Sequence, residues 1–389
     1  MLNSDRLRAD TPGTATTFHL NAAGAALMPQ PVIDAMKRHI DLEARLGGYR
    51  AADVREDDIT AVYTVFATLL GCQPHNIAIV ENATAGFTQA LAAIEWRRGD
   101  VLLTTDNDYC SNFIAYHFLN QRFGVRIERA PEAESGGFEP AATAERIRQS
   151  CPRVVAISHI PTSSGLIQPV ESLTEASRDA GSILLVDGCQ SLGQIDVDTS
   201  GFDIFTASTR KFLRGPRGVG IMVINDTLLE TDFAPLLPDM RGAKWDAHES
   251  VHLRSGARRF ENWEFNYAAL LGAGAAAEYA LSIGMGAIEQ HLVAAAHVLR
   301  KRVRDETSWQ VLDRGTRLGA IVTAHKAGCS ANSVRDALLS ARVQHSITEA
   351  SSARIDFAKK GVDWALRLSP HVYTSEADVD AAIEVLARL

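Results

Sequence analysis

An aspartate and a lysine lie near the ends of two successive apolar runs, where their side chains could act together. Asp187 directly follows Ile183–Val186, and Lys211 comes 24 residues later, behind Arg210. A carboxylate that closes a buried run needs a cationic partner. Cationic neighbours destabilise the ammonium form of a lysine and so give a nucleophilic amine. Because most lysines in basic loops are simply solvated, Lys211 needs support from other segments before it indicates catalysis.

Three other segments supply groups that suit a phosphorylated aromatic ligand. The small residues of Glu81–Gly86 leave the first amides of a predicted helix open to a phosphate. Tyr109 offers a flat face for stacking on a heteroaromatic ring. Arg367 ends an apolar run and can bind a carboxylate through two hydrogen bonds. Each segment also has an ordinary interpretation, namely a capping turn, an aromatic side chain packed on a sheet and a surface ion pair.

Together these groups describe a single ligand. It needs a phosphate site, a stacking face, an acid that keeps a ring nitrogen protonated and a lysine that forms a Schiff base. Pyridoxal phosphate meets all four requirements, and an aspartate–lysine pair is the usual protein contribution to its electronics. The sequence therefore predicts a pyridoxal-phosphate site around Asp187 and Lys211.

Seven short runs rich in β-branched residues alternate with helical patterns and predict the elements that position these groups. Apolar strands separated by helices are typical of a largely parallel sheet with helices on both faces, and ligands bind at the carboxyl ends of such strands. The predicted strands are Ile77–Val80, Val101–Thr105, Val125–Glu128, Val154–Ser158, Ile183–Asp187, Asp203–Ala207 and Gly218–Ile224. The helices predicted between them are Thr84–Ile94, Ser111–Arg122, Pro140–Gln149 and Glu171–Ala180.

The pattern changes after residue 265, where an Ala- and Gly-rich stretch begins a second α+β region. Its predicted elements are helices Tyr267–Ala287 and Ile288–Glu306, strand Leu318–Thr323, helix Ser333–Ala341, strand Trp364–Leu368 and helix Glu376–Leu389. We therefore expect an N-terminal arm of residues 1–30, a large domain of residues 31–265 and a small domain of residues 266–389.

The composition is that of an ordinary globular protein, with 46% hydrophobic and 22% charged residues in 389. The net charge of −8 argues against a nucleic-acid-binding surface. No apolar run of about 18 residues is present, and the first ten residues lack the apolar core of a secretory signal. The five cysteines form no C-x-x-C pair and the twelve histidines show no metal-site spacing. We expect a cytoplasmic protein that binds no metal, nucleic acid or membrane.

The residues at positions 184–220 resemble those of the class V aminotransferases, a family of fold type I pyridoxal-phosphate enzymes. The resemblance extends from His19–Gly24 to Leu366–Tyr373 and covers nearly the whole chain. It implies a seven-stranded, mostly parallel α/β sheet with a smaller α+β C-terminal domain. The family includes cysteine desulfurases, selenocysteine lyases, isopenicillin N epimerase and the sulfoxide lyase of ergothioneine biosynthesis, and the overall resemblance is nearest to the last of these.

The resemblance implies a role for each cofactor-binding residue. Lys211 would carry the cofactor as a Schiff base, Asp187 would pair with the pyridinium nitrogen, and Gln190 would reach the phenolic oxygen of the ring. Tyr109 would stack on the ring, where desulfurases have a histidine. The implied phosphate ligands are Thr84, the Ala85 amide, Ser208, Arg210 and, from the other subunit of a homodimer, Trp263.

The resemblance also implies a site for an amino-acid substrate, shared between the two subunits of the homodimer. Arg367 would bind the α-carboxylate of the substrate. Asn21 and Ala23 are expected to contact the substrate, and Tyr49 is expected to enter the neighbouring subunit's site.

The reaction type depends on groups that the resemblance does not fix. Desulfurases carry a cysteine on the loop before the carboxylate-binding arginine, whereas the loop Thr348–Arg354 contains none. A persulfide-forming desulfurase is therefore not expected. We expect C–S β-elimination from an S-substituted cysteine or its sulfoxide, with Lys211 taking the α-proton and Tyr109 protonating the departing sulfur. The alternatives are a class V aminotransferase that uses a keto acid, an amino-acid epimerase and an inactive binding module of the same fold.

Overall fold

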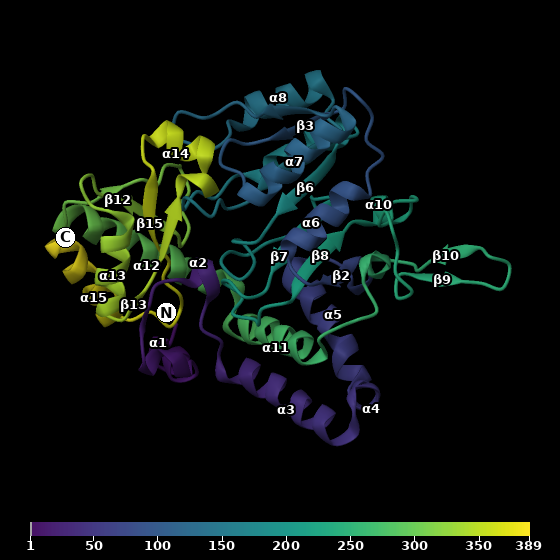
Figure 1. Ribbon diagram of the computed structural model, residues 1–389, viewed down its shortest axis with the longest axis horizontal. Coiled ribbons are helices and arrows are strands. Elements are labelled where there is room, and N and C mark those ends of the chain that lie inside the picture. Colours follow the sequence, from purple (N-terminus) through teal and green to yellow (C-terminus); the bar gives the residue numbers. More distant parts are fainter. Residues whose placement is uncertain (1) are drawn as a thin grey trace.

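The computed structural model describes residues 2–389, so Met1 of the predicted N-terminal arm lies outside it. Its largest element is a seven-stranded sheet of order β2-β8-β7-β6-β5-β3-β4 (Figure 1). Neighbouring strands are parallel except at β8, which runs antiparallel to β2 and β7. This mostly parallel sheet confirms the predicted fold class. The strands are β2 (Ile77–Val80), β3 (Val101–Thr104), β4 (Arg126–Arg129), β5 (Val154–Ser158), β6 (Ile183–Asp187), β7 (Ile204–Ser208) and β8 (Gly220–Ile224).

Burial on both faces explains why the strands of this sheet are apolar. Every strand residue is buried except on the edge strand β4 and at the first residue of β6. In β2, Ile77 and Ile79 belong to one hydrophobic cluster and Ala78 and Val80 to another. Because successive strand side chains point to opposite faces, the sheet separates two hydrophobic cores.

Helices cover the two faces and bury these cores (Figure 1). Helices α6 and α7 contribute Phe87 and Tyr116 to one core, whereas α5 contributes Phe66 to the other. The helices of this part are α3 (Gln30–Leu46), α4 (Gly48–Val54), α5 (Glu56–Leu70), α6 (Ala83–Ala92), α7 (Cys110–Phe123), α8 (Pro140–Ser150), α9 (Thr174–Asp179) and α10 (Asp226–Leu229). Since α6 and α7 directly follow β2 and β3, their N-termini lie at the carboxyl edge of the sheet.

The C-terminal part forms a second, antiparallel sheet of order β11-β12-β15-β14. Its strands are β11 (Gln310–Val311), β12 (Val322–His325), β14 (Ser346–Glu349) and β15 (Trp364–Leu368), and its helices are α12 (Met285–Glu306), α13 (Ala331–Ser340), α14 (Arg354–Lys360) and α15 (Glu376–Arg388). The N-terminal residues join this part, because β1 (Phe18–His19) pairs with β13 (Val343–Gln344). Helices α1 (Ser4–Ala9) and α2 (Ala22–Ala25) flank β1.

The long helix predicted over Tyr267–Ala287 is wrong in its extent. It ends as α11 (Tyr267–Ile283), and α12 begins at Met285. Gly284 between them has a φ of 93°, a left-handed conformation that interrupts a right-handed helix and that glycine adopts without steric cost.

The strand predicted over Leu318–Thr323 lies at Val322–His325 instead. Leu318 forms an isolated bridge with Leu166, and the N–H of the next residue donates to the carbonyl of Gly165 at 2.6 Å. The first half of the predicted strand therefore bonds to the loop after β5, and pairing with the small sheet starts only afterwards.

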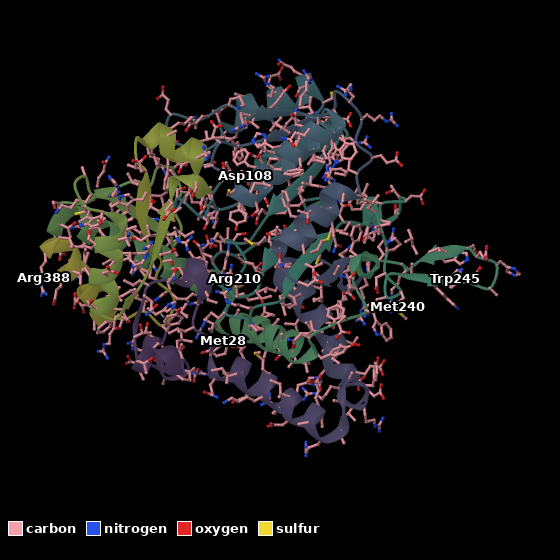
Figure 2. All side chains as sticks on the ribbon, viewed as in Figure 1. Met28, Asp108, Arg210, Met240, Trp245 and Arg388 are labelled. Carbon is pink, nitrogen blue, oxygen red and sulfur yellow. The ribbon has the colours of Figure 1, made fainter. Side chains whose placement is uncertain are left out.

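An antiparallel hairpin that the sequence did not predict extends away from both sheets (Figure 1). It consists of β9 (Ala243–Trp245) and β10 (Val251–Leu253). Figure 2 labels Trp245 on this hairpin, and its side chain is 74% exposed.

The two sheets lie within the parts predicted as large and small domains, and the exact boundaries stay predictions. Helix α11, the first helix of the predicted small domain, packs against α3 and α5. We therefore propose that the small domain begins after α11. Of the helices within residues 2–389, none is by itself long and apolar enough to cross a membrane, and α11 and α12 reach that length together only across an 82° bend.

Candidate active site

The carboxyl ends of β5, β6 and β7 place polar residues side by side. Ser158, Asp187 and Thr206 occupy paired positions in the sheet register and are all buried. The Asp187 carboxylate accepts hydrogen bonds from the Cys189 N–H and from Nδ2 of Asn112, both at 3.0 Å. It forms no ion pair with any residue from 2 to 389. A buried carboxylate without a cation is costly, so this edge of the sheet has a place for a cationic group.

A tight turn after β7 holds Lys211 at the same edge. The Thr209 hydroxyl donates to the Pro216 carbonyl at 2.9 Å and lies 3.1 Å from the Val219 carbonyl. A Cβ at Gly215 would lie 2.7 Å from the Cβ of Thr209, so a larger residue there would open the turn. Lys211 is 8% exposed, and its Nζ forms no hydrogen bond within the described part of the chain. The turn thus presents a buried amine.

The charges around this turn suit a nucleophilic amine. Burial lowers the pKa of Lys211 below its ordinary value, and the positive charges of Arg210 and Arg367 lower it further, whereas Cys189 and Asp187 raise it. More of the amine is therefore unprotonated at neutral pH than in a solvated lysine. Burial raises the pKa of Cys189, so this neighbouring side chain stays a thiol.

The N-terminus of α6 lies beside the same turn. Ser208, the last residue of β7, accepts a hydrogen bond from the Ala83 N–H at 3.0 Å through its Oγ. Thr84, the second residue of α6, is exposed on this turn. A helix N-terminus with a buried hydroxyl beside it is a suitable place for a phosphate, as the sequence predicts for Ser208 and Thr84.

Two other predicted phosphate ligands have partners of their own in this structure. The Ala85 N–H donates to the side chain of Asn82 at 2.9 Å, which caps α6. Arg210 donates through Nη1 to the carbonyl of Gly24, and burial lowers its pKa. A phosphate held by these groups would have to share or replace these contacts, and their phosphate-binding roles stay predictions.

Tyr109 lies at the entrance to this group of residues. It is the N-cap residue of α7 and is 37% exposed. It is close enough to Arg210 and Arg367 to raise the pKa of each. The structure therefore brings the predicted stacking residue together with the predicted phosphate and carboxylate ligands.

Arg367 reaches the site from β15 of the small sheet. Its Nη1 donates to the carbonyl and to the hydroxyl of Thr162, at 3.2 and 2.5 Å. Its buried Nε has no partner among residues 2–389. Burial lowers the pKa of Arg367 to about 10, so the guanidinium remains charged at neutral pH. A buried, charged guanidinium with an unused N–H is suited to a carboxylate.

The segment after β1 closes the site from its N-terminal side. Gln190 donates through Nε2 to the carbonyl of Ala23 at 3.1 Å and to the hydroxyl of Thr162 at 2.9 Å. The Oε1 of Gln190 and the Oδ1 of Asn21 are both buried without a hydrogen-bond partner in the described residues. The predicted residues Asn21, Ala23 and Gln190 therefore converge on the same place as Arg367.

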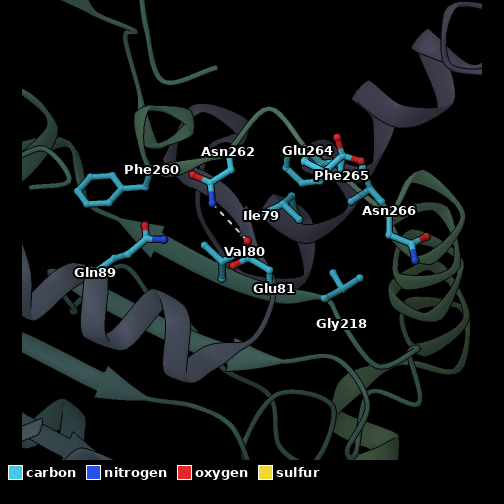
Figure 3. A pocket seen from close by; sticks show the side chains of 12 residues that line it. Ile79, Val80, Glu81, Gln89, Gly218, Phe260, Asn262, Glu264, Phe265 and Asn266 are labelled. Carbon is cyan, nitrogen blue, oxygen red and sulfur yellow. Dashed lines mark hydrogen bonds between the residues drawn. The ribbon is translucent and has the colours of Figure 1, made fainter. Parts of the chain in front are cut away.

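Trp263 and Tyr49 do not join the site within one chain. The Trp263 N–H donates to Asp239 at 2.7 Å, and its ring is 47% exposed. Figure 3 shows the adjacent small pocket, in which Asn262 donates to Glu81 at 3.3 Å. Tyr49 is 81% exposed on α4, at the end of α3 away from β15 (Figure 1). Their predicted contacts with a partner subunit's site stay predictions.

Two buried residues of the site were not predicted. Nδ2 of Asn112 donates to both Asp187 and Asp108, each at 3.0 Å. Asp108, labelled with Arg210 in Figure 2, also accepts hydrogen bonds from the hydroxyls of Ser158 (2.6 Å) and Tyr116 (2.7 Å). The available signal was the four-residue spacing of Asp108 and Asn112 at the start of a helix, which places the two side chains together.

The family model described as "Aminotransferase class-V" matches residues 18–382 of the chain. The chain belongs to this family. The match covers both sheets and every residue of the site, which confirms the resemblance read from the sequence.

Individual class V relatives differ in the activity that their names state. A Mycobacterium tuberculosis protein named as a probable hercynylcysteine sulfoxide lyase is 28% identical over 398 aligned residues, covering 98% of this chain and 92% of that protein. A probable cysteine desulfurase of Pyrococcus abyssi is 26% identical over 293 residues, covering 73% of this chain and 72% of that protein. The apo cysteine desulfurase of Thermococcus onnurineus superposes with a TM-score of 0.91 at 23% identity, over 100% of this chain and 98% of that chain.

Pyridoxal phosphate is the cofactor of the class V family, and the chain is a pyridoxal-phosphate-dependent enzyme. The residues present fit this cofactor. The uncompensated carboxylate of Asp187 suits a protonated ring nitrogen, the amine of Lys211 suits an aldehyde, and Ser208 at the N-terminus of α6 suits a phosphate. When bound, pyridoxal phosphate accepts the electron pair left at the Cα of an amino acid after a bond there breaks. The assignment of each residue to a cofactor atom stays a prediction.

Proposed function

We propose that this enzyme cleaves the C–S bond of an S-substituted cysteine, or of its sulfoxide, by β-elimination. The proton on Cα is removed, the Cβ–S bond breaks, and the sulfur leaves with the bonding electrons. Addition of water then releases pyruvate and ammonia, while the sulfur departs as a thiol, or as a sulfenic acid from a sulfoxide. No oxidant or reductant is consumed.

The observation that carries this proposal is the loop Thr348–Arg354, which contains no cysteine. Together with α7, the second half of this loop covers a cavity of about 270 Å³. Phe113, Ile114 and His117 of α7 line it from one side, and residues 351–356 line it from the other. Cys110 and Ser163, the sequence neighbours of Tyr109 and Thr162, lie at its edge. Free cysteine is too small to fill this space, whereas a substituent on the sulfur of a larger substrate would fill it.

Three residues around the proposed substrate would have separate roles in binding and proton transfer. Arg367 would hold the α-carboxylate through its unused N–H groups. Lys211, with its lowered pKa, would take the proton from Cα. The hydroxyl of Tyr109, at the entrance to the site, would donate a proton to the departing sulfur. These two proton transfers occur at opposite ends of the Cα–Cβ–S unit, as an elimination requires.

A second candidate is a cysteine desulfurase, the activity that several relatives carry in their names. Such an enzyme needs a thiol near the substrate sulfur to accept it. The thiol of Cys110 lies 3.5 Å from the carbonyl of Ser351 on the same loop, so Cys110 could take that part from α7. The other nearby thiol, Cys189, is buried and has a raised pKa.

Product analysis separates these reactions. The loaded enzyme is incubated with cysteine and with S-methyl, S-benzyl and sulfoxide derivatives of cysteine, with and without a keto acid. Elimination predicts pyruvate and ammonia from the substituted cysteines without a keto acid. Alanine from free cysteine, with the sulfur left as a persulfide that an added thiol reductant releases as sulfide, would instead establish a desulfurase if Cys110→Ser abolished it. Strict dependence on a keto acid would indicate transamination, and inversion at Cα alone would indicate an epimerase.

The cavity itself can be tested by filling it. Ile114→Trp should raise KM for S-benzylcysteine, by an amount that corresponds to about 1–3 kcal/mol of overpacking, and leave KM for S-methylcysteine unchanged. Val298→Trp on α12 is a matched control, since both side chains are about half exposed, 55% and 51%. Equal effects on both substrates, or in both variants, would contradict the use of the cavity.

We also propose that the enzyme is a homodimer, with Trp263 and Tyr49 contributing to the partner's site. The support is a set of large apolar side chains that are exposed in one chain, namely Leu236, Leu237, Met240, Trp245, Val251 and Trp263. Exposed apolar groups at this density mark an interface. Analytical ultracentrifugation should give twice the chain mass of 42.1 kDa, and Trp245→Asp should shift the equilibrium toward the monomer. A monomeric and fully active wild type would refute the shared site.

A further inference from the structure

A buried network behind Asp187 contains two carboxylates and no cation. Asp108, Asn112 and Asp187 are 6%, 2% and 6% exposed. Nδ2 of Asn112 donates one hydrogen to Asp108 and the other to Asp187, each at 3.0 Å. The two acceptor oxygens are therefore within about 6 Å of each other. Neither carboxylate forms an ion pair with residues 2–389, so two negative charges share one bridging amide.

The other contacts of Asp108 suit an ionised carboxylate. Besides the bridging amide, it accepts hydrogen bonds from the hydroxyls of Thr104 (2.7 Å), Tyr116 (2.7 Å) and Ser158 (2.6 Å) and from the Tyr109 N–H (2.6 Å). The Tyr109 N–H and the Asn112 amide can only donate, and the three hydroxyls can donate as well, which favours the ionised form of Asp108. Burial raises the pKa of Asp108, whereas the three hydroxyls lower it.

We propose that Asn112 and Asp108 are positioning residues for the cofactor, acting through Asp187. Asn112 fixes the orientation of the Asp187 carboxylate, and the charge of Asp108 behind it strengthens the hold of Asp187 on a protonated ring nitrogen. A positive charge at that nitrogen offsets both buried carboxylates. This inference rests on the proposed pairing of Asp187 with the nitrogen.

The same elements that build the site also build this network. Thr104 and Ser158 are the last residues of β3 and β5, and Asp187 is the last residue of β6. Asp108 and Asn112 come from the start of α7. The position of α7 on the sheet therefore determines both the location of Tyr109 and the charge behind Asp187.

The protonation of the ring nitrogen can be measured directly by ¹⁵N NMR. The full-length enzyme is loaded with pyridoxal phosphate labelled at the ring nitrogen and titrated with pH in the absence of substrate. Because the nitrogen would lie beyond Asp187, it would be farther from Asp108 than the roughly 6 Å between the two carboxylates, so at an effective dielectric constant of about 20 Asp108→Asn should lower the pH of nitrogen deprotonation by about one unit. An unchanged titration in the folded variant would overturn the role of Asp108.

Asp203→Asn is a matched control for the change of charge. Asp203 lies just before β7, at the opposite end of the same sheet, where it accepts hydrogen bonds from the Leu184 N–H (2.8 Å) and Asn225 (2.6 Å). Burial raises its pKa as it does that of Asp108. Asp203 is only partly buried, and its removal should leave the nitrogen titration unchanged; a shift as large as that of Asp108→Asn would show that a charge elsewhere in the sheet has the same effect, which overturns the specific role.

Two further variants keep the test decisive. If Asp108→Asn does not fold, Tyr116→Phe removes one donor from Asp108 and retains the buried ring; the charge of Asp108 is then less neutralised, so a small shift of nitrogen deprotonation to higher pH is expected. Asn112→Ala should weaken pyridoxal-phosphate binding about five- to tenfold, less than the roughly 10- to 150-fold of a lost hydrogen bond made directly to a charged ligand, because Asn112 acts through Asp187. If Tyr116→Phe titrates like the wild type, the role of Asp108 is overturned. If Asn112→Ala binds the cofactor as tightly as the wild type, the role of Asn112 is overturned.

Asp187→Asn distinguishes failure of the inference from failure of the site assignment. If the ring nitrogen stays protonated in Asp187→Asn as in the wild type, the pairing with Asp187 is wrong. If the proton is lost in Asp187→Asn but the titrations of Asp108→Asn and Tyr116→Phe match that of the wild type, the pairing holds and the network behind it has no role. All of these measurements are independent of the substrate and of the reaction type.

Discussion

Replacement of Arg367 is the most direct test of how the enzyme binds its substrate. In the structure, the guanidinium uses Nη1 for Thr162 and leaves the buried Nε without a partner. A substrate carboxylate would accept hydrogen bonds from the N–H groups of the guanidinium that have no partner. Arg367→Ala removes this charge-assisted interaction, which is worth about 1.5–3 kcal/mol.

This free energy corresponds to an increase in KM of roughly 10- to 150-fold. Because the guanidinium would bind the carboxylate and takes no part in breaking the Cα–H or C–S bond, kcat should change less than KM. The cofactor should remain bound, and the visible absorbance of the loaded enzyme should therefore be that of the wild type. Steady-state kinetics on an S-substituted cysteine, with absorbance recorded before substrate is added, measures all three quantities.

The control is a substrate that lacks the carboxylate, such as an S-substituted cysteamine. It should be poor for the wild type, and Arg367→Ala should not make it worse. Thr162→Val should raise KM by an intermediate amount, because it removes the hydroxyl that holds Nη1 and leaves the guanidinium in place. If Arg367→Ala raised KM for the amine as much as for the amino acid, or if the wild type preferred the amine, Arg367 would not be the carboxylate ligand.

The remaining predictions concern the amine, the phosphate site and stability toward acid. Lys211→Ala should abolish turnover with an unchanged circular-dichroism spectrum, and it should bind no cofactor that borohydride can fix covalently; substantial residual turnover would remove Lys211 from its assigned role. Ser208→Ala should weaken cofactor binding by about 0.5–1.5 kcal/mol, the value of one neutral hydrogen bond, measured by fluorescence titration. Burial lowers the pKa of His19 to about 4 and that of His159 to about 3, so below pH 6.5 the unfolded chain takes up protons first. The contribution of the two histidines to the free energy of unfolding, measured in denaturant titrations, should therefore be retained above pH 6.5. As the pH decreases toward 4, it should fall by up to about 1.4 kcal/mol per pH unit for each histidine. A flat profile over this range would contradict the buried neutral state of both rings.

The central strands could be predicted from the sequence because each is buried on both faces. Such strands are nearly continuous apolar runs, and Val154–Ser158 and Ile183–Asp187 were predicted with the bounds that the structure has. The same reasoning failed for Leu318, because this residue bridges to Leu166 in the loop after β5 and does not pair within a sheet. Burial against a loop and burial in a sheet leave the same pattern in the sequence.

The site was predictable where its residues end strands and less so where they meet through tertiary contacts. Asp187 and Lys211 follow adjacent strands, so the parallel topology alone brings them together. The contact of Arg367 with Thr162 joins residues 205 positions apart; the end of an apolar run suggested that Arg367 binds a carboxylate, but not which part of the fold it would contact. Asp108 was missed because aspartate, serine, threonine and tyrosine near a helix start are equally suited to a solvated cap, and their common burial appears only in the fold.

The distribution of charge in the site bears on which ligand it holds and in which orientation. The buried carboxylates of Asp108 and Asp187 form no ion pair with residues 2–389, whereas Arg210 and Arg367 lower the pKa of Lys211 and Arg210 lowers that of Arg367. Each cluster is unfavourable without a ligand, because like charges are brought together in a medium of low polarity. A ligand with a cation at one end and anions at the other relieves both, and it can do so in one orientation only. Pyridoxal phosphate with an amino-acid substrate has this charge distribution, and the proposed assignments would place its ring nitrogen toward the two aspartates and its phosphate and carboxylate groups toward the arginines. A neutral analogue of the same shape would fill the same space and leave both clusters uncompensated, so the affinity for the cofactor should depend on the charge of its ring nitrogen more than on its contacts with the ring faces.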